Sequence, residues 1–274
     1  MADTWYSKDV PPGASSGFWG YIVGVLRALF LVPFVFGGLL LLLLIRLIEY
    51  PLCGAHRPVT PAITTFVCRN SLRVLGVGYE VKGQPLAKEG AIVANHSSWL
   101  DIFALNAATQ LYFVSKAEVA TWPGIGWLAR ATGTVFIERD RRQARAHIDV
   151  FKNRLAAGHK LLFFPEGTST DGLQVLPFKP TLFAAFLDPE MDKDLPLQAV
   201  TVVYHAPKGQ DPRFYGWWGN MDFGPHLWST LAATRQGKIE VVFHEPVLAS
   251  SFADRKVMAQ ALEDQVREAL TVRT

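Results

Sequence analysis

The sequence has little of what a disulfide framework, a zinc site or a disordered chain requires. Its 274 residues include only two cysteines, Cys53 and Cys68, which excludes a disulfide network and a cysteine-rich zinc site. Two reduced, buried thiols are expected, with a single bridge between them as the alternative. Charged residues make up 19% of the chain and hydrophobic residues 50%, so intrinsic disorder is excluded.

Signatures of nucleotide, nucleic-acid and metal binding are also missing. The chain has no P-loop and no Gly-x-Gly-x-x-Gly that follows a strand. Its net charge of +3 suits an anionic lipid surface or a phosphate ligand. No basic stripe interleaved with aromatic residues occurs, so nucleic acid is not an expected partner. His205, His226 and His244 lack a metal-binding spacing, and neither a metal nor a cofactor is expected.

What the sequence does contain is one long apolar run near its start. Residues 1–17 are polar and rich in Gly, Pro and Ser, which predicts a flexible tail. Between Arg27 and Arg46 stand eighteen residues without one charged or polar side chain. As a helix they would reach about 27 Å, close to the hydrocarbon thickness of a bilayer. The run therefore predicts a membrane helix.

This helix could meet the membrane in several ways. A cleaved signal peptide is the simplest alternative, but the run starts late, and Arg46 follows it where small residues should mark a cleavage site. A retained anchor is therefore favoured. Pro33 and the pair Gly37-Gly38 would allow residues 28–45 either to cross the bilayer or to re-enter one leaflet.

A second amphipathic helix is predicted at residues 61–75, beside the first in the membrane interface. Residues 18–76 thus form the expected membrane-embedded and interfacial segment. Positively charged residues gather after the apolar run, at Arg46, Arg57, Arg69 and Arg73. That asymmetry predicts that the following domain, residues 77–274, lies on the cytoplasmic side.

From residue 77 onward, short apolar strands alternate with helical stretches. Strands are predicted at 79–82, 91–94, 112–114, 135–137, 161–164, 199–204 and 239–243. Helices are predicted at 100–108, 141–157, 227–234 and 254–270. The alternation predicts an α/β domain with a mainly parallel or mixed sheet and flanking helices. Functional side chains are expected on the loops at strand ends.

Two strand exits hold the residues best suited to chemistry. The first leads into a His-x-x-x-x-Asp pattern, His96 and Asp101, where a helix begins. Residues five apart on a continuous helix point about 140° from each other, so the pair can meet only if His96 lies in a non-helical turn. Asp101 would then hold one ring nitrogen and leave the other free as a base. Taken alone, so short a pattern is more often a helix-capping Asp beside a buried His.

The second exit presents Glu166 at the same kind of edge, because a proline ends the strand and Gly167 permits a tight turn. A solvated turn carboxylate is the commoner case for such a residue alone. A third segment places Arg139 just after a strand. Its guanidinium there would bind a phosphate or carboxylate, or pair with a neighbouring acid.

In their order and spacing, the three segments resemble the glycerolipid acyltransferase family, whose members acylate glycerol phosphate and lysophosphatidic acid. One matching box runs from His96 to Asp101, and a Gly-x-x-Phe-Ile-x-Arg run ends at Arg139. The last is a Phe-Pro-Glu-Gly-Thr box from Phe164 to Thr168. The resemblance extends over about residues 80–205 and implies an α/β acyltransferase domain.

The resemblance implies a role for each matching residue. His96 would be the general base that takes the proton from the acceptor hydroxyl as it attacks an acyl thioester, and Asp101 would orient and stabilise it. The acceptor head group would be bound by Lys116, Arg139, Glu166, Gly167 and Thr168. The implied partners are acyl carrier protein or acyl-CoA as donor, a lysolipid acceptor and the lipid bilayer, at a bacterial inner membrane.

One position departs from the family pattern. The family box usually continues with an arginine after the threonine, and here Ser169 follows. Losing that cation weakens the case for a phosphorylated acceptor. Together with the run Asn220-Met-Asp-Phe-Gly224, the variant resembles the bacterial branch that acylates lyso-ornithine lipid, whose acceptor has a zwitterionic head without phosphate. Lyso-ornithine lipid is the favoured acceptor and lysophosphatidic acid the alternative.

Two other classes of function stay open on the sequence alone. A lipid or thioester hydrolase would use the same His–Asp pair with water as the acceptor. A non-catalytic lipid-binding or scaffold protein would have no need of His96 and Asp101. Tracing the reaction products separates the transferase from both.

Overall fold

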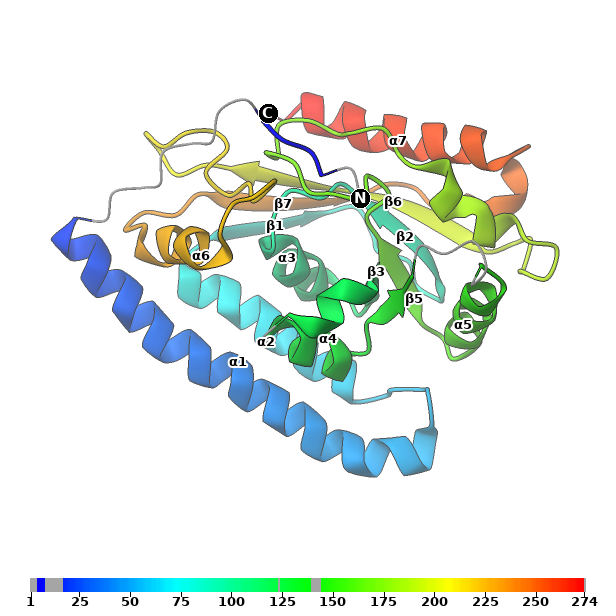
Figure 1. Ribbon diagram of the computed structural model, residues 1–274, viewed down its shortest axis with the longest axis horizontal. Helices are drawn as coiled ribbons and strands as arrows, with labels where there is room; N and C mark the ends of the chain where they lie inside the picture. The colour runs from blue at the N-terminus through cyan, green and yellow to red at the C-terminus, as the bar shows by residue number, and fades with distance from the viewer. Residues whose placement is uncertain (1–3, 8–16, 123, 139–143, 274) are drawn as a thin grey trace.

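The computed structural model describes residues 4–7, 17–122, 124–138 and 144–273 of the chain. A central sheet has helices on both faces, and the long helix α1 (Phe18–Cys53) runs along the outside (Figure 1).

The eight strands of the described chain form one mixed sheet with the order β1-β7-β6-β2-β5-β3-β4, and β8 pairs with β6. The central strands are parallel: β2 pairs with both β5 and β6, and β3 pairs with β5 and β4. Strand β7 is antiparallel to β6 and parallel to β1. The strands are β1 (Gly78–Lys82), β2 (Gly90–Ala94), β3 (Tyr112–Lys116), β4 (Val135–Ile137), β5 (Lys160–Phe163), β6 (Pro196–His205), β7 (Lys238–Phe243) and β8 (Val247–Leu248). The predicted α/β fold with a mainly parallel or mixed sheet is confirmed.

Two apolar cores lie on the two faces of this sheet. One is covered by α5 (Ala144–Ala156), α7 (Arg255–Thr271) and the 3₁₀ helix Pro180–Leu187. The other is covered by α2 (Thr60–Leu75), α3 (Leu100–Ala108) and α6 (Phe223–Ala232). Strand β2 is buried along its whole length, as expected for a central parallel strand covered on both faces. The loops after β2 and its neighbours are therefore held on a rigid base.

The predicted elements occur with a few differences. Helix α6 begins at Phe223 rather than at 227, because Pro225 stands in its first turn, where a proline is tolerated. Residues 141–143 of the helix predicted at 141–157 lie outside the described residues. Helix α4 (Ile125–Thr132) and strand β8 are additional elements, too short for an apolar period to indicate them.

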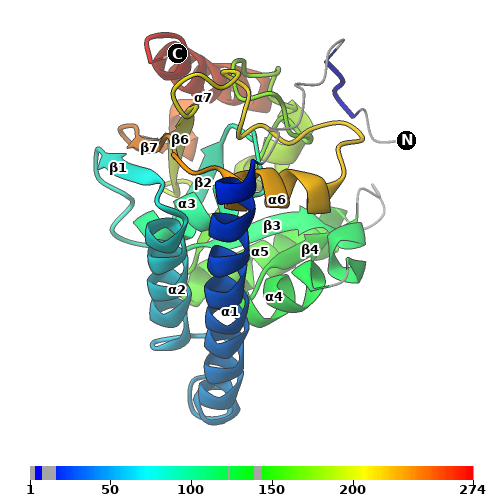
Figure 2. The ribbon, with the colours of Figure 1, turned by 90° about the vertical axis from the view of Figure 1, so that its left-hand side faces the viewer.

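Helix α1 packs against α6, α2 and α4, and its last turns project beyond these helices (Figures 1 and 2). Near its start, Gly24 contacts α6, and Arg27 donates hydrogen bonds to the carbonyls of Leu231 and Ala233 at 2.8 and 2.6 Å. At its far end, Arg57, in the turn that follows α1, donates to the carbonyl of Ala131 in α4 at 2.8 Å. The start of the helix and the turn that follows it are thus fixed to the α/β domain.

Helix α2 lies between α1 and α3. Its buried side, which includes Cys68 and Leu72, faces the domain. Its other side faces α1, where the rings of Phe34 and Phe66 are 6.2 Å apart. Cys53 and Cys68 are both free thiols, as predicted, but only Cys68 is buried, while Cys53 at the end of α1 is half-buried.

Among the described residues, α1 is the one helix long and apolar enough to cross a membrane. Only 6% of its most apolar window of 18 residues is buried. Its exposed face carries large apolar side chains, such as Leu29, Phe30, Leu40 and Leu44. This face would be unstable in water and indicates membrane association.

Candidate active site

His96 and Glu166 meet at one edge of the sheet because the strands before them are parallel neighbours. Val93 of β2 stands opposite Phe163 of β5, so the carboxyl ends of both strands lie side by side. The backbone N–H of His96 donates a hydrogen bond of 2.7 Å to Oε1 of Glu166. The two strand exits singled out in the sequence thus form one site.

His96 lies in a non-helical turn, and Asp101 reaches back to it from the first turn of α3. Asp101 Oδ2 lies 2.7 Å from His96 Nδ1 and also accepts hydrogen bonds from the backbone N–H groups of Ser97 and Ser98, at 2.8 and 3.0 Å. The start of a helix favours a negative charge as well. With the carboxylate bound at Nδ1, Nε2 is left as the ring atom that can accept a proton.

The two members of this pair differ in exposure, as a base and its orienting group should. The Asp101 side chain is completely buried, whereas that of His96 is 24% exposed. The imidazole stacks on the ring of Phe164, with ring centroids 4.1 Å apart and planes 13° apart. The ring orientation is thus fixed from two sides while one edge stays accessible.

Tyr204 is a member of the site that sequence reasoning missed. Its hydroxyl donates a 2.5 Å hydrogen bond to Oδ1 of Asp101. Burial, followed by the charge of Asp101, raises the pKa of Tyr204 well above its usual value, so the phenol remains a donor. The strand containing Tyr204 was predicted, but nothing in its local pattern indicates a contact with a residue 103 positions earlier.

Asn95 was also missed, and it fixes the strand that leads to His96. Its side chain accepts from the N–H of Val202 at 2.8 Å and donates to the carbonyl of Val202 at 2.9 Å. The amide thus continues the pairing of β2 with β6 beyond the last residue of β2. A hydrogen-bonding side chain directly before the histidine was the available signal.

Glu166 faces inward rather than toward open solvent. Its side chain is almost fully buried, and its second oxygen accepts from the N–H of Leu176 at 2.8 Å. Burial raises the pKa of Glu166 to about 8, against the opposing effect of the two N–H donors at Leu176 and His96. The two hydrogen bonds of Glu166 therefore position the turn at His96 and the loop after Gly167.

The other predicted head-group residues lie at the same edge where they are described. Gly167, with φ of 74°, adopts the left-handed conformation of a tight turn and donates its N–H to the Phe164 carbonyl at 3.1 Å. The Thr168 hydroxyl accepts from the N–H of Trp5 at 3.4 Å. Lys116 is the half-buried last residue of β3. Arg139 lies outside the described residues.

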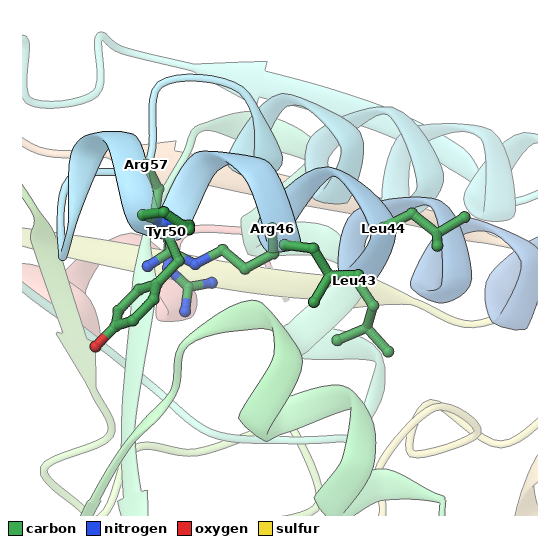
Figure 3. A pocket seen from close by; sticks show the side chains of 7 residues that line it. Leu43, Leu44, Arg46, Tyr50 and Arg57 are labelled. Carbon is green, nitrogen blue, oxygen red and sulfur yellow. The ribbon is translucent and has the colours of Figure 1, made fainter.

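The groove in Figure 3 lies away from this site, at the far end of α1. It has a volume of about 530 Å³ and is lined by Leu43, Leu44, Arg46, Leu47, Tyr50, Pro51 and Arg57. None of the site residues lines it. Within the described parts of the chain, no group of three or more His, Cys, Asp or Glu side chains is arranged to hold a metal ion.

The chain is 54% identical to the lyso-ornithine lipid O-acyltransferase of Rhodobacter capsulatus, over 98% of each chain. This chain belongs to the acyltransferase family. The family model described as Acyltransferase matches residues 78–204 of this acyltransferase, the part that contains His96, Asp101, Glu166 and Tyr204. The predicted membership of an O-acyltransferase family is confirmed.

Two more distant proteins resemble this acyltransferase. The 1-acyl-sn-glycerol-3-phosphate acyltransferase of Neisseria gonorrhoeae is 31% identical, over 73% of this chain and 77% of that protein. The crystal structure of the 1-acyl-sn-glycerophosphate acyltransferase of Thermotoga maritima superposes with a TM-score of 0.63 over 92% of this chain and 96% of that one. At 22% identity, this likeness shows a shared fold.

Proposed function

We propose that this acyltransferase moves a fatty acyl group from an acyl thioester to the hydroxyl of lyso-ornithine lipid, giving ornithine lipid. The 54% identity to a lyso-ornithine lipid O-acyltransferase over nearly the whole of both chains is the main support for this acceptor. Ser169, which stands where phosphate-binding relatives usually have an arginine, is consistent with an acceptor that lacks phosphate.

The geometry of His96 and Asp101 is the observation that carries the reaction class. Nε2 of His96 takes the proton of the acceptor hydroxyl while the oxygen attacks the carbonyl carbon of the thioester. Asp101 stabilises the imidazolium that forms, and its 2.7 Å contact keeps the ring oriented. The tetrahedral intermediate then expels the thiolate, which takes the proton back from His96. The acyl group passes directly to the acceptor, so no acyl-enzyme is needed.

Glu166 and Tyr204 act as positioning residues in this proposal. Glu166 binds the backbone of His96 itself, and Tyr204 binds the oxygen of Asp101 that His96 does not use. The head group of the acceptor lies toward Thr168 and Lys116, with Arg139 as a further predicted contact that lies outside the described residues. The donor is acyl carrier protein or acyl-CoA.

Lysophosphatidic acid is the second candidate acceptor. The 31% identity to a 1-acyl-sn-glycerol-3-phosphate acyltransferase favours it, although less than the closer relative favours lyso-ornithine lipid. Acylating it would use the same base and the same thioester, with a phosphate at the head-group end.

In this proposal α1 inserts into one leaflet of the membrane and lies parallel to the membrane plane. Since α1 packs against α6, α2 and α4, and Arg27 near its start is bonded to the end of α6, a crossing helix would pull these elements of the domain into the hydrocarbon. The groove of leucines beside Arg46 and Arg57 suits the boundary between acyl chains and head groups. The domain faces the cytoplasm at the bacterial inner membrane, on the side of the positively charged residues.

This arrangement is tested by the accessibility of an N-terminal tag. If α1 lies in one leaflet, the tag and the domain stay on the cytoplasmic side, and protease added outside spheroplasts leaves both intact. Cleavage of the tag alone under these conditions would mean that α1 crosses the bilayer.

The acceptor is tested by competition. Purified full-length protein in detergent micelles receives a labelled acyl carrier protein thioester with equal amounts of lyso-ornithine lipid and lysophosphatidic acid, and products are identified by mass. Mainly ornithine lipid is expected. Mainly phosphatidic acid would assign the second candidate, and free fatty acid alone would refute the transferase. A parallel reaction with acyl-CoA identifies the donor, and the His96→Ala protein is the blank.

A further inference from the structure

A short N-terminal segment, residues 4–7, contacts loops at the acceptor end of the site although it lies far from them in sequence. The N–H of Trp5 donates to the hydroxyl of Thr168 at 3.4 Å, across 163 residues. The Tyr6 hydroxyl donates to Oδ1 of Asn220 at 3.1 Å, across 214 residues. The segment thus bridges two separate loops, 167–172 and 216–222.

The indole of Trp5 lies over the second of these loops. Its ring is 6.0 Å from that of Trp218, at an angle of 56°. Trp218 is almost fully buried, whereas Trp5 is only half-buried and keeps part of its surface open. The backbone at Gly219 is so close that a Cβ added there would be 3.0 Å from the Tyr6 ring. This close packing indicates that residues 4–7 occupy a specific position on the loop.

Both loops are bonded to the turn that contains His96. In the first loop, the N–H of Thr170 donates to the His96 carbonyl at 2.9 Å. In the second, the N–H of Trp217 donates to the Ser97 carbonyl at 2.8 Å. Residues 4–7 are therefore linked through both loops to the turn that holds the catalytic base.

The charges of this region suit a cation. Residues 4–7, 167–172 and 216–222 include no Lys or Arg but two aspartates, Asp171 and Asp222. Asp222 is exposed. Aromatic faces attract ammonium groups and offer nothing to a phosphate. The region around Ser169, where the family usually has an arginine, is thus aromatic and weakly anionic.

We propose that residues 4–7 form the head-group end of the acceptor site and that the open face of Trp5 receives the primary ammonium of the acceptor. The inference rests on lyso-ornithine lipid as acceptor and names the group that recognises its amine. Trp5 is a specificity-determining residue in this account, and Tyr6 positions it through Asn220. Lysophosphatidic acid, which has no amine, gains nothing from Trp5.

The test compares two acceptors in the full-length protein: lyso-ornithine lipid and the same lipid with its side-chain amine acetylated. Trp5→Ala should raise the KM for lyso-ornithine lipid roughly 3- to 30-fold, the range of one cation–π contact, and leave the KM for the acyl donor unchanged. Acetylation should raise the wild-type KM by a similar factor and should make Trp5→Ala and wild type nearly equal. Trp5→Phe, which keeps an aromatic face, should recover much of the loss.

Trp19→Ala is the matched control, because Trp19 is a 71% exposed tryptophan near the same end of the chain. It should leave both acceptor KM values unchanged. The proposal is overturned if Trp5→Ala impairs both acceptors equally, since Trp5 would then only hold the Thr168 loop, or if it impairs neither. Failure of the wild-type protein to acylate lyso-ornithine lipid at all is a different result, and it would refute the proposed acceptor itself.

Discussion

The Tyr204 hydroxyl and the Asp101 carboxylate are joined by a hydrogen bond of 2.5 Å on the side of Asp101 away from His96. Asp101 is fully buried and Tyr204 nearly so. Oδ2 of Asp101 is occupied by His96 and two backbone N–H groups, while Oδ1 has Tyr204. The carboxylate is therefore fixed in rotation, and the imidazole is fixed with it.

Tyr204→Phe should weaken both stability and catalysis. Loss of a buried hydrogen bond to a charged group should cost about 1.5–3 kcal/mol in the free energy of unfolding and lower kcat about 10-fold, because Asp101 loses one of its restraints. Tyr215→Phe is the control, since its ring lies 5.7 Å from that of Tyr204 and its hydroxyl bonds Gln236 and Gly237 instead. It should lower stability but spare kcat. Equal kcat values for the two variants would dismiss a positioning role for Tyr204.

His96→Ala should lower kcat by about 10²- to 10⁴-fold, the usual worth of a positioned general base. Acceptor binding should change little, because the head group is held elsewhere. Single-turnover rates with a labelled thioester measure the effect. The control is His147→Ala, which removes a half-buried histidine of α5 and should leave kcat unchanged. A near wild-type rate for His96→Ala would exclude His96 as the base.

Asp101→Asn should remove the negative charge of Asp101 while keeping its hydrogen bonds. The amide oxygen can take the place of Oδ2, and the amide N–H₂ can donate to the Tyr204 oxygen, so the fold should be retained. The negative charge that stabilises the imidazolium is lost, and kcat should fall by about 10²- to 10⁴-fold. Activity is measured together with the thermal midpoint. A large fall in the midpoint with little change in kcat would contradict this account.

Glu166 should make stability depend on pH. Burial raises its pKa to about 8 from a usual 4.5, so the folded protein binds this proton more tightly than the unfolded chain does. The stabilising contribution is complete below about pH 4.5 and is lost as the pH rises through about 8, with a slope of at most about 1.4 kcal/mol per pH unit. Thermal unfolding of wild type and Glu166→Gln at pH 5.5 and pH 8.5 measures the contribution of this proton to stability, because the variant does not have it.

The exposed residue Glu118 supplies the control for that comparison. Glu118→Gln should show the pH dependence of wild type. A Glu166→Gln protein that loses stability with pH as steeply as wild type would mean that the buried carboxyl is already ionised at neutral pH.

The sequence could predict the parts of this molecule that depend on local pattern. The strand before His96 and the helix from 100 to 108 follow from apolar runs and their flanks, and the non-helical turn at His96 follows from helix geometry. The meeting of His96 with Glu166 follows once both strands are taken as parallel neighbours. These inferences need only short-range information.

What the sequence could not predict depends on contacts between distant segments. Nothing local indicates that the Tyr204 phenol reaches Asp101 or that Glu166 turns inward to bind the His96 backbone. The position of β7 between β6 and β1, antiparallel to the first and parallel to the second, depends on pairing between strands that are far apart in the sequence. The hydrogen bond between Trp5 and Thr168 joins residues that are 163 positions apart.

Gly37 and Gly38 illustrate the same limit and give a matched pair for the contact of α1 with α2. In the sequence they are equivalent neighbours, yet a Cβ on Gly37 would meet open space and one on Gly38 would lie 2.5 Å from Cγ2 of Val67. Gly37→Ala should therefore be neutral or stabilise by up to about 1 kcal/mol, since alanine is the better helix former. Gly38→Ala should cost about 1–3 kcal/mol, because Val67 is stiff and the helices must separate. Thermal unfolding of both variants in the same micelles measures the difference, and an equal response would mean that α1 and α2 are not in close contact at this point.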